Sequence, residues 1–138
     1  MAIEIRRLGP GDEDVVRALA TDEPQTALLG DDRTIFLAAF DRGEPVGFVF
    51  GYELLRRHGD PSILFVYEIE VAAACRGQGV GARLLRELAG VARARGIPTG
   101  FVLTNASNDA AMRLYESLDG VRPNPDDVMW DFEWSQVD

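Results

Sequence analysis

Hydrophobic and polar positions along the chain repeat with two periods, and the period of two is typical of strands. Alternating or continuously apolar runs predict strands at 3–8, 33–40, 46–54, 63–71 and 98–105, and a strictly alternating last strand at 128–136. The polar turn "DRGEP" joins 33–40 and 46–54 into a hairpin. The run "ILFVYEIEV" at 63–71 is so apolar that we expect a central strand covered on both faces.

The period near 3.6 predicts helices between these strands. One begins near residue 12, and residues 22–32 favour one or two helical turns. Two longer helices cover 80–95 and 106–120. Their expected boundaries are Gly96 at the end of the former, Asn105 or Ser107 at the start of the latter, and Gly120 at its end. The order of elements predicts a single α/β domain over residues 1–138.

The composition narrows the class of partner. With 46% hydrophobic and 27% charged residues, the 138-residue chain is typical of a globular domain. Its 23 acidic and 14 basic residues give a net charge of −9. This charge disfavours nucleic acid and anionic membranes as partners and suits a cationic substrate, or it serves solubility alone.

The single cysteine and the single histidine limit disulfide and metal chemistry. Cys75 alone allows no disulfide within the chain, and with His58 it makes no zinc cluster, so we expect no metal site. We expect Cys75 to be packed and His58 to be solvated. No apolar run reaches about 18 residues, and the first residues lack a signal-peptide pattern, so we expect a cytoplasmic location.

Three glycines stand together in "CRGQGVGARLL" at residues 75–85, between a predicted strand and a predicted helix. Gly77, Gly79 and Gly81 oppose helix formation, because each costs up to about 1 kcal/mol relative to alanine. Glycines also let the backbone approach a ligand closely and turn the unpaired N–H groups of a helix start toward it. The stretch therefore predicts a phosphate cradle, or else a glycine-rich turn without a ligand.

Two motifs resemble those of the GNAT superfamily of acyl-CoA-dependent N-acetyltransferases. The first is R-x-x-G-x-G after the strand at 63–71, and the second is N-x-x-A-x-x-L-Y on the next helix. They consist of Arg76, Gly79 and Gly81, and of Asn108, Ala111, Leu114 and Tyr115. The resemblance implies a GNAT fold with a mixed, mostly antiparallel central sheet flanked by helices, and it implies acetyl-CoA as the cosubstrate.

The resemblance also implies that the main chain does most of the cofactor binding. Val71 and Ala73 would pair with the pantetheine arm, and the Val71 N–H would polarise the thioester oxygen. Asn108 would contact the pantetheine or diphosphate region. Arg76, Arg83 or Arg86 is a candidate for the 3′-phosphate, or these arginines are only solvated. The cofactor-binding set implied is Val71, Ala73, Arg76, Gly77, Gln78, Gly79, Val80, Gly81, Ala82 and Asn108.

Glu68 and Glu70 are the candidate groups for an amine substrate. They lie two residues apart in a predicted strand and so share a face. We expect Leu64 and Val66 on that face as well, and Tyr67, Ile69 and Val71 on the other. A buried strand does not carry unpaired carboxylates. Either these groups meet arginines or solvent, or they bind a substrate ammonium and remove its proton.

A closer resemblance links "VYEIEVAAACRGQGVGARLL" and "VMWDFEW" to the aminoglycoside 3-N-acetyltransferases, whose activity would confer antibiotic resistance. In that group an acidic residue, typically aspartate, follows a tyrosine, and Glu68 after Tyr67 stands there. The resemblance implies that Glu68 is the general base and that Tyr115 protonates the CoA thiolate; the alternative for Tyr115 is a core position. The family's "LGF" or "LGI" is replaced by "LDGV", so the loop at 119–127 departs from the family near the acceptor entrance.

The predicted last strand adds acidic and aromatic groups. Asp131 and Glu133 would join Tyr67, Glu68 and Glu70 in binding a cationic aminoglycoside, or they are the polar side of a half-exposed strand. The apolar face carrying Trp130 and Trp134, together with the resemblance, indicates a homodimer.

Two other functions fit the same residues. The acceptor could be another amine, such as a polyamine, a protein N-terminus or a small metabolite. The chain could also bind acyl-CoA as a catalytically silent module, although the presence of both Glu68 and Tyr115 favours an enzyme.

Overall fold

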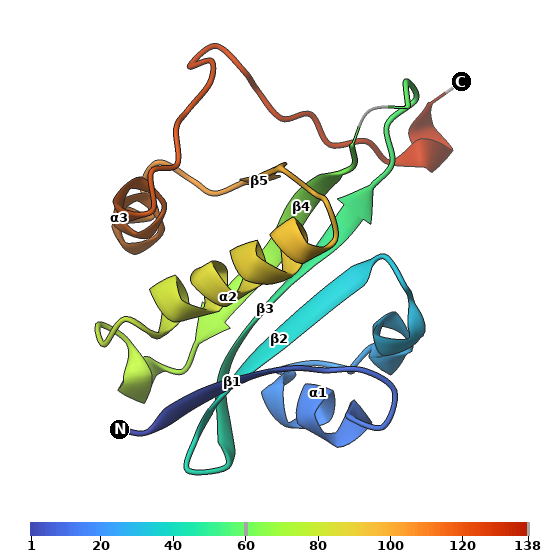
Figure 1. The fold of residues 1–138 in the computed structure, drawn as a ribbon. Coiled ribbons are helices and arrows are strands. Elements are labelled where there is room, and N and C mark those ends of the chain that lie inside the picture. Colours follow the sequence, from blue (N-terminus) through green and yellow to red (C-terminus); the bar gives the residue numbers. More distant parts are fainter. Residues whose placement is uncertain (60, 138) are drawn as a thin grey trace.

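The computed structural model describes residues 1–59 and 61–137, which form a five-stranded sheet with helices on both faces (Figure 1). The strands lie in sequence order, and neighbours are antiparallel except for the parallel pair β4 and β5. This mixed, mostly antiparallel sheet confirms the expected fold class. The strands are β1 (Ile3–Arg7), β2 (Thr34–Asp41), β3 (Glu44–Leu54), β4 (Ile63–Val71) and β5 (Thr99–Val102).

Two cores lie on opposite faces of the sheet. On one face, α2 buries Leu84 and Leu88 against apolar side chains of the strands. On the other, α1 and η1 cover β2 and β3, where Phe36 stacks on Phe48 and Phe50. In the described part of the chain, no helix is long and apolar enough to cross a membrane. The helices are α1 (Glu13–Leu19), α2 (Val80–Ala94) and α3 (Asp109–Ser117), with 3-10 turns η1 (Thr26–Gly30), η2 (Ala73–Cys75) and η3 (Trp134–Gln136).

The ends of the helices follow the sequence only in part. Gly96 ends α2 as expected, with φ +76°. The cap of α3 is Asn108 rather than Asn105 or Ser107, because the Asn108 side chain accepts a hydrogen bond from the Ala111 N–H at 3.1 Å. The left-handed residue after α3 is Asp119 (φ +64°) rather than Gly120. A non-glycine residue therefore occupies the position at which helices favour glycine.

Replacing Asp119 with glycine is expected to stabilise the fold by about 1 kcal/mol, because glycine adopts the left-handed conformation without steric cost. Urea unfolding followed by circular dichroism measures the change. The Gly120→Ala variant is the control with the opposite sign, since its Cβ would lie 2.9 Å from the Tyr115 carbonyl oxygen. An unchanged or lowered midpoint for Asp119→Gly would contradict this description of the helix end.

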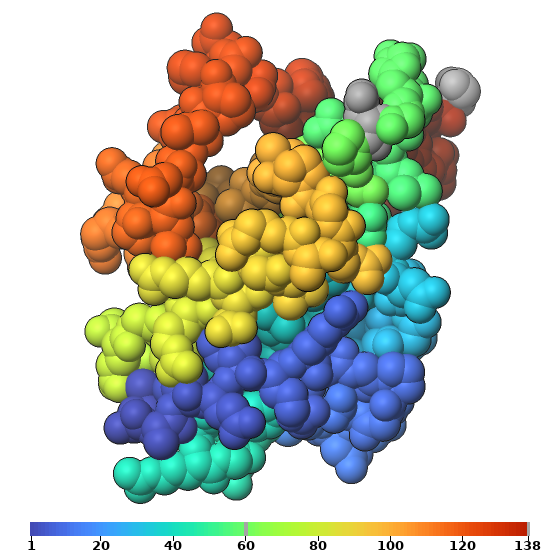
Figure 2. Space-filling view, in the orientation of Figure 1, coloured from blue at the N-terminus to red at the C-terminus, as the bar shows by residue number. Residues whose placement is uncertain are grey.

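The predicted last strand is wrong. Residues 128–133 have no regular structure, and 134–136 form the 3-10 turn η3. Residues 119–137, here called the C-terminal arm, are all exposed, and Figure 2 shows the arm in orange and red arching away from the body of the molecule. Alternation marks a segment that can pair as a strand, but a strand also needs a neighbouring edge for its hydrogen bonds.

Candidate active site

The sheet opens between β4 and β5. Their parallel ladder runs from Ile63 opposite Thr99 to Val66 opposite Val102, where β5 ends. β4 continues for five more residues, to Val71, and there its ladder is with β3. The second half of β4 therefore presents one backbone edge to the opening.

A β-bulge in β4 sets which side chains face the opening. Phe50 of β3 lies opposite Glu68, but Gly51 lies opposite Val66, so Tyr67 is the extra residue. The ring centroids of Tyr67 and Phe50 are 5.5 Å apart, and Phe50 lies opposite Glu68 in the ladder. Because side chains of opposite residues share a face, Tyr67 lies on the same face as Glu68 and Glu70. Strict alternation had placed Tyr67 on the opposite face, and this is wrong because the bulge shifts the period by one residue.

The bulge also corrects the expected neighbours of the carboxylates. Leu64 and Val66, like Ile69 and Val71, pack on the α2 face and do not share the face of Glu68. Tyr67, Glu68 and Glu70 are exposed, with Tyr67 at 58%. β4 is therefore covered by helix α2 on one face, whereas its other face is accessible around the carboxylates. The expectation of a strand covered on both faces is wrong for this half of β4.

The Val71 peptide faces the opening. The Ala72 N–H donates to the Val46 carbonyl of β3 at 2.7 Å, and N–H directions alternate along a strand, so the Val71 N–H points away from β3. The Val71 carbonyl accepts a hydrogen bond from Nε of Arg76 at 3.0 Å. This bond ties the Arg76 side chain to the end of β4 and leaves the Val71 N–H directed at the space that β5 vacates.

Glycine is needed at positions 77, 79 and 81 for two different structural reasons. Gly77 and Gly79 have φ of +74° and +81°, which L side chains rarely adopt. Gly81 lies in the first turn of α2, where a Cβ would come within 3.2 Å of Leu114 of α3. Gly79 caps α2 without a side-chain hydrogen bond, so the first N–H groups of this 15-residue helix are open to a ligand.

The predicted cofactor-binding residues fall into two groups. Backbone positions 77–82 surround the start of α2, and Ala73 lies in η2 directly after β4. Three polar side chains are already used locally: Arg76 on Val71, Asn108 as the α3 cap, and Gln78, whose Nε2 lies 3.5 Å from the Ala74 carbonyl. Of the helix arginines, Arg83 donates to the Ile3 carbonyl at 3.1 Å. The arrangement offers main-chain donors, together with a positive helix end, for anionic oxygens.

The side of the opening that carries Glu68 and Glu70 combines negative charge with aromatic rings. The pKa of Glu68 is raised above its usual range, first by lost hydration and second by the negative charge of Glu70. Aromatic rings surround Tyr67: its ring centroid lies 5.5 Å from that of Tyr52 and 5.6 Å from that of Phe65. Carboxylates beside aromatic faces favour an alkylammonium group.

Tyr52 is a residue of this site that the sequence analysis missed. It packs edge-on against both Phe50 and Tyr67. Burial raises its pKa, and Tyr67, Asp31 and Glu68 contribute in the same direction. The sequence does indicate that Tyr52 shares a face with Phe50, because the two are two residues apart in a predicted strand. It does not indicate which face of that strand lies beside Glu68 and Glu70.

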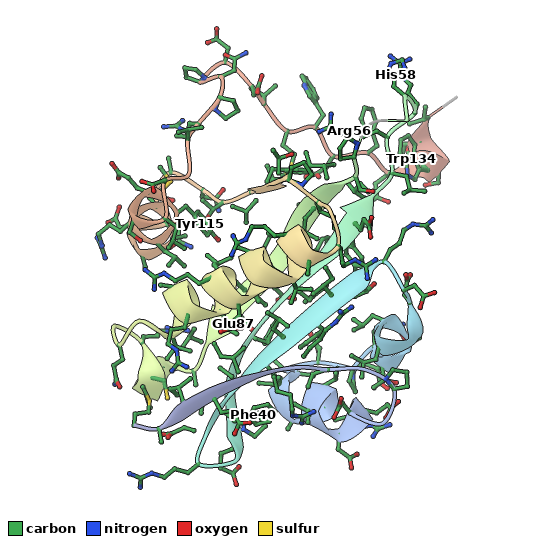
Figure 3. All side chains as sticks on the ribbon, in the orientation of Figure 1. Phe40, Arg56, His58, Glu87, Tyr115 and Trp134 are labelled. Atoms are coloured by element: carbon green, nitrogen blue, oxygen red, sulfur yellow. The ribbon has the colours of Figure 1, made fainter. Side chains whose placement is uncertain are left out.

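Tyr115 and the arm residues complete the predicted set. Tyr115 lies half-buried on α3, and burial raises the pKa of its phenol (Figure 3). The Leu114 side chain of α3 lies close to Gly81 in the first turn of α2, where a Cβ would come within 3.2 Å of it. By contrast, Asp131 and Glu133 lie on the exposed arm and not in a strand beside Glu68, so the structure does not bring them together with Glu68, and their part in acceptor binding stays a prediction. Cys75 is buried and His58 is exposed, as expected.

The sequence of most of the chain matches the model of a known family. Residues 5–120 fit the sequence pattern of the Acetyltransferase (GNAT) family, and the chain belongs to that family. Members of this family use acetyl-CoA as the acyl donor. The left-handed glycines and the open N–H groups at the start of α2 fit the diphosphate of this donor.

The relatives and similar structures are acetyltransferases with different names. The chain is 40% identical over 77 residues to an L-2,4-diaminobutyric acid acetyltransferase of Streptomyces coelicolor, covering 55% of this chain and 44% of that protein. It thus spans less than half the length of that relative. An aminoglycoside acetyltransferase, HMB0005, from an uncultured soil metagenomic sample has a similar structure, with a TM-score of 0.83, 28% identity, and coverage of 96% of this chain and 99% of the other.

A second similar structure is that of AAC(6')-Iy in complex with a bisubstrate analogue of CoA and acetylneamine. It has a TM-score of 0.79 at 16% identity and covers 96% of this chain and 99% of the other. At this identity the likeness concerns the fold.

Proposed function

We propose that the chain transfers the acetyl group of acetyl-CoA to an amino group of an aminoglycoside, at the 3-amino nitrogen, and thereby confers resistance. The observation that carries this proposal is Glu68, which lies beside Tyr67 on the accessible face of β4, three residues before the Val71 N–H that faces the opening. A base and an oxyanion donor on one short stretch suit acyl transfer to an amine. We further propose that the enzyme acts in the cytoplasm as a homodimer.

In the proposed mechanism, each protein group has one task. Glu68 accepts a proton from the bound ammonium, which frees the amine lone pair to attack the thioester carbonyl carbon. The Val71 N–H donates to the carbonyl oxygen as negative charge develops there. When the carbon–sulfur bond breaks, Tyr115 donates its phenolic proton to the departing thiolate. The second proton of the attacking nitrogen returns to the Tyr115 oxygen through water, and Glu68 releases the first proton to solvent. The open N–H groups at the start of α2 fix the donor by its diphosphate.

A polycationic acceptor agrees with the charge and shape of the site. Glu68 and Glu70 lie on one face of β4, and within the described residues neither forms an ion pair with an arginine or histidine. The aromatic rings of Tyr52 and Tyr67 lie beside them. The whole chain is acidic, which speeds the arrival of cations. A diamino acid is the second candidate acceptor, favoured by the identity to the diaminobutyric acid acetyltransferase.

The acceptor panel that tests the proposal contains a gentamicin-type aminoglycoside, spermidine, L-2,4-diaminobutyrate and a short peptide. CoA release is measured for each at saturating acetyl-CoA. We expect the highest kcat/KM with the aminoglycoside. A higher kcat/KM for another amine would make that amine the substrate in place of the aminoglycoside. Binding of acetyl-CoA with no CoA release for any acceptor would indicate a silent binding module.

The Tyr115→Phe variant is expected to lower kcat about 10-fold to 100-fold without a change in the Kd for acetyl-CoA, because phenylalanine fills the same space but donates no proton. Burial raises the pKa of the Tyr115 phenol, so it holds its proton throughout the neutral range. The decrease should be smaller with a thioester whose thiol is more acidic. Wild-type kcat in this variant would restrict Tyr115 to a packing role.

The Glu70→Gln variant is expected to move the acid limb of the kcat/KM profile, which reports the pKa of Glu68 in the free enzyme, to lower pH. Glu68 must be deprotonated to act as a base, so activity falls as the pH drops through its raised pKa. Glu70 is one of the two causes of that raised pKa, and removing its charge lowers the pKa of Glu68. The kcat/KM profile between pH 5 and pH 9, compared with that of the wild type, measures this shift. An acid limb that stays in place or moves to higher pH would show that the charge of Glu70 does not raise the pKa of Glu68.

A further inference from the structure

The face of β4 and β5 opposite α2 lies outside the core on that side of the sheet. Within the described residues, that core is built from α1, η1, β2, β3 and Leu8, and it has no member from β4 or β5. Tyr67 on β4 is 58% exposed and Phe101 on β5 is 40% exposed. Large aromatic side chains on an accessible sheet face, next to a candidate active site, are typical of a surface that binds a ligand.

Four aromatic side chains, Tyr52, Tyr67, Phe65 and Phe101, follow one another across this face and are here called the aromatic row. Tyr52 of β3 lies opposite Phe65 of β4, and Phe65 lies opposite Phe101 of β5. The rings of Phe65 and Phe101 stack with centroids 4.7 Å apart, and Tyr67 packs edge-on against Phe65 and Tyr52. Because neighbouring strands are about 4.8 Å apart, the row extends over about 10 Å, which is enough for one or two rings of a ligand.

The two ends of the aromatic row differ in charge. Lost hydration is the largest cause of the raised pKa of Tyr52, and the carboxylates of Asp31 and Glu68 add to it, so negative charge gathers at this end. At the other end, Phe101 and Leu103 after it present apolar surface, and Leu103 is 58% exposed. The row therefore complements an amine whose charged group is attached to a body with apolar surface.

The place of the donor limits the direction in which an acceptor can extend. In the proposed function, the start of α2 binds the diphosphate and the Val71 N–H binds the thioester oxygen, so the donor occupies the end of β4 at Val71. The reacting amine lies at Glu68. The rest of the acceptor then extends back along β4, away from the donor and toward Phe65 and Phe101.

We propose that the aromatic row selects acceptors whose amino group is attached to a ring, and that Phe65 and Phe101 bind that ring while Glu68 holds the amine. Saturated rings of amino sugars and aminocyclitols present CH groups that pack against aromatic side chains, whereas a linear polyamine or diamino acid has no ring to place there. The proposal rests on the proposed function, because it takes Glu68 as the site of the amine, but it does not depend on which ring the acceptor carries.

The first test compares a cyclic and a linear amine of equal charge with the wild-type protein. CoA release is measured with trans-1,4-diaminocyclohexane and with 1,4-diaminobutane, which both carry two amino groups and differ by two carbon atoms. Each buried CH₂ group is worth a factor of about four, so we expect kcat/KM to be about 10-fold higher for the cyclic amine. An equal or higher kcat/KM for the linear amine would overturn the proposal.

The second test removes the ring at the apolar end of the row. Phe101→Ala should raise KM about 10-fold for diaminocyclohexane and for a gentamicin-type aminoglycoside, and it should leave KM for 1,4-diaminobutane unchanged. Phe101→Leu keeps part of the apolar surface and should give a smaller increase. The control is Leu55→Ala, which shortens an exposed apolar side chain outside the row and should leave every KM unchanged. An unchanged Kd for acetyl-CoA shows that each variant folds.

The outcomes separate this inference from the proposed function. Acetylation of the aminoglycoside with a KM that does not respond to Phe101→Ala overturns the role of the aromatic row alone. If that variant instead changes the mass of the protein in light scattering, the row is a contact between copies. Acetylation of diaminocyclohexane with a KM that depends on Phe101, but not of the aminoglycoside, overturns the aminoglycoside acceptor and keeps the row. Acetylation of none of these amines overturns both.

Discussion

The Glu68→Gln variant is expected to lower kcat by about 100-fold or more. An alkylammonium has a pKa near 10, so almost all of the acceptor amine is protonated at neutral pH and needs a base before it can attack. Glutamine keeps the size and hydrogen-bonding reach of Glu68 but cannot take up a proton. The loss should shrink as the pH rises, because free amine then forms in solution. Steady-state CoA release between pH 7 and pH 9 measures both effects.

The control for Glu68→Gln is Glu87→Gln, which removes the same charge from the exposed surface of α2 (Figure 3). It should keep wild-type kcat. Both variants should bind acetyl-CoA with an unchanged Kd, because neither touches the start of α2. A Glu68→Gln enzyme with wild-type turnover would remove Glu68 from the mechanism.

The second large effect is expected at the glycines before α2. Replacing both Gly77 and Gly79 with alanine should weaken acetyl-CoA binding by about 100-fold. Each alanine in a left-handed conformation costs about 1–2 kcal/mol, and 1.4 kcal/mol corresponds to a factor of ten. The free protein can relax the loop to avoid this cost, but the bound state requires the N–H groups to converge on the diphosphate. Isothermal titration with acetyl-CoA gives the change in Kd.

The control for these glycines is Gly90→Ala, within α2, where an added Cβ meets nothing within 4 Å. It should stabilise the protein by up to about 1 kcal/mol, since alanine favours a helix, and it should leave the Kd unchanged. A double glycine variant that binds acetyl-CoA as tightly as the wild type would show that the left-handed loop does not serve the donor.

Much of the fold could be predicted because its signals are local. The hairpin of β2 and β3, the apolar β4 and the amphipathic α2 each have a periodicity that a few residues define. The cap at Gly96 followed the same logic. The bulge at Tyr67 could not be predicted, because it depends on how β3 and β4 align, and no residue of β4 alone marks it.

The site shows the same division. The glycine loop and Glu68 could be proposed as site residues from the sequence, because glycines are costly at a helix start and a carboxylate is costly in an apolar strand. Tyr52 was missed because its role depends on which strands lie side by side. The last strand was wrong since 128–134 has the pattern of a strand but no edge of its own chain pairs with it in the described structure. Pairing depends on tertiary or quaternary contacts that a pattern does not contain.

The most direct test of the central claim is the product formed from acetyl-CoA and a gentamicin-type aminoglycoside. Mass spectrometry shows whether the aminoglycoside gains an acetyl group, and NMR shows which nitrogen carries it. We predict one acetyl group on the 3-amino nitrogen, formed in step with CoA release. An unmodified aminoglycoside, under conditions in which the protein binds acetyl-CoA, would contradict the claim.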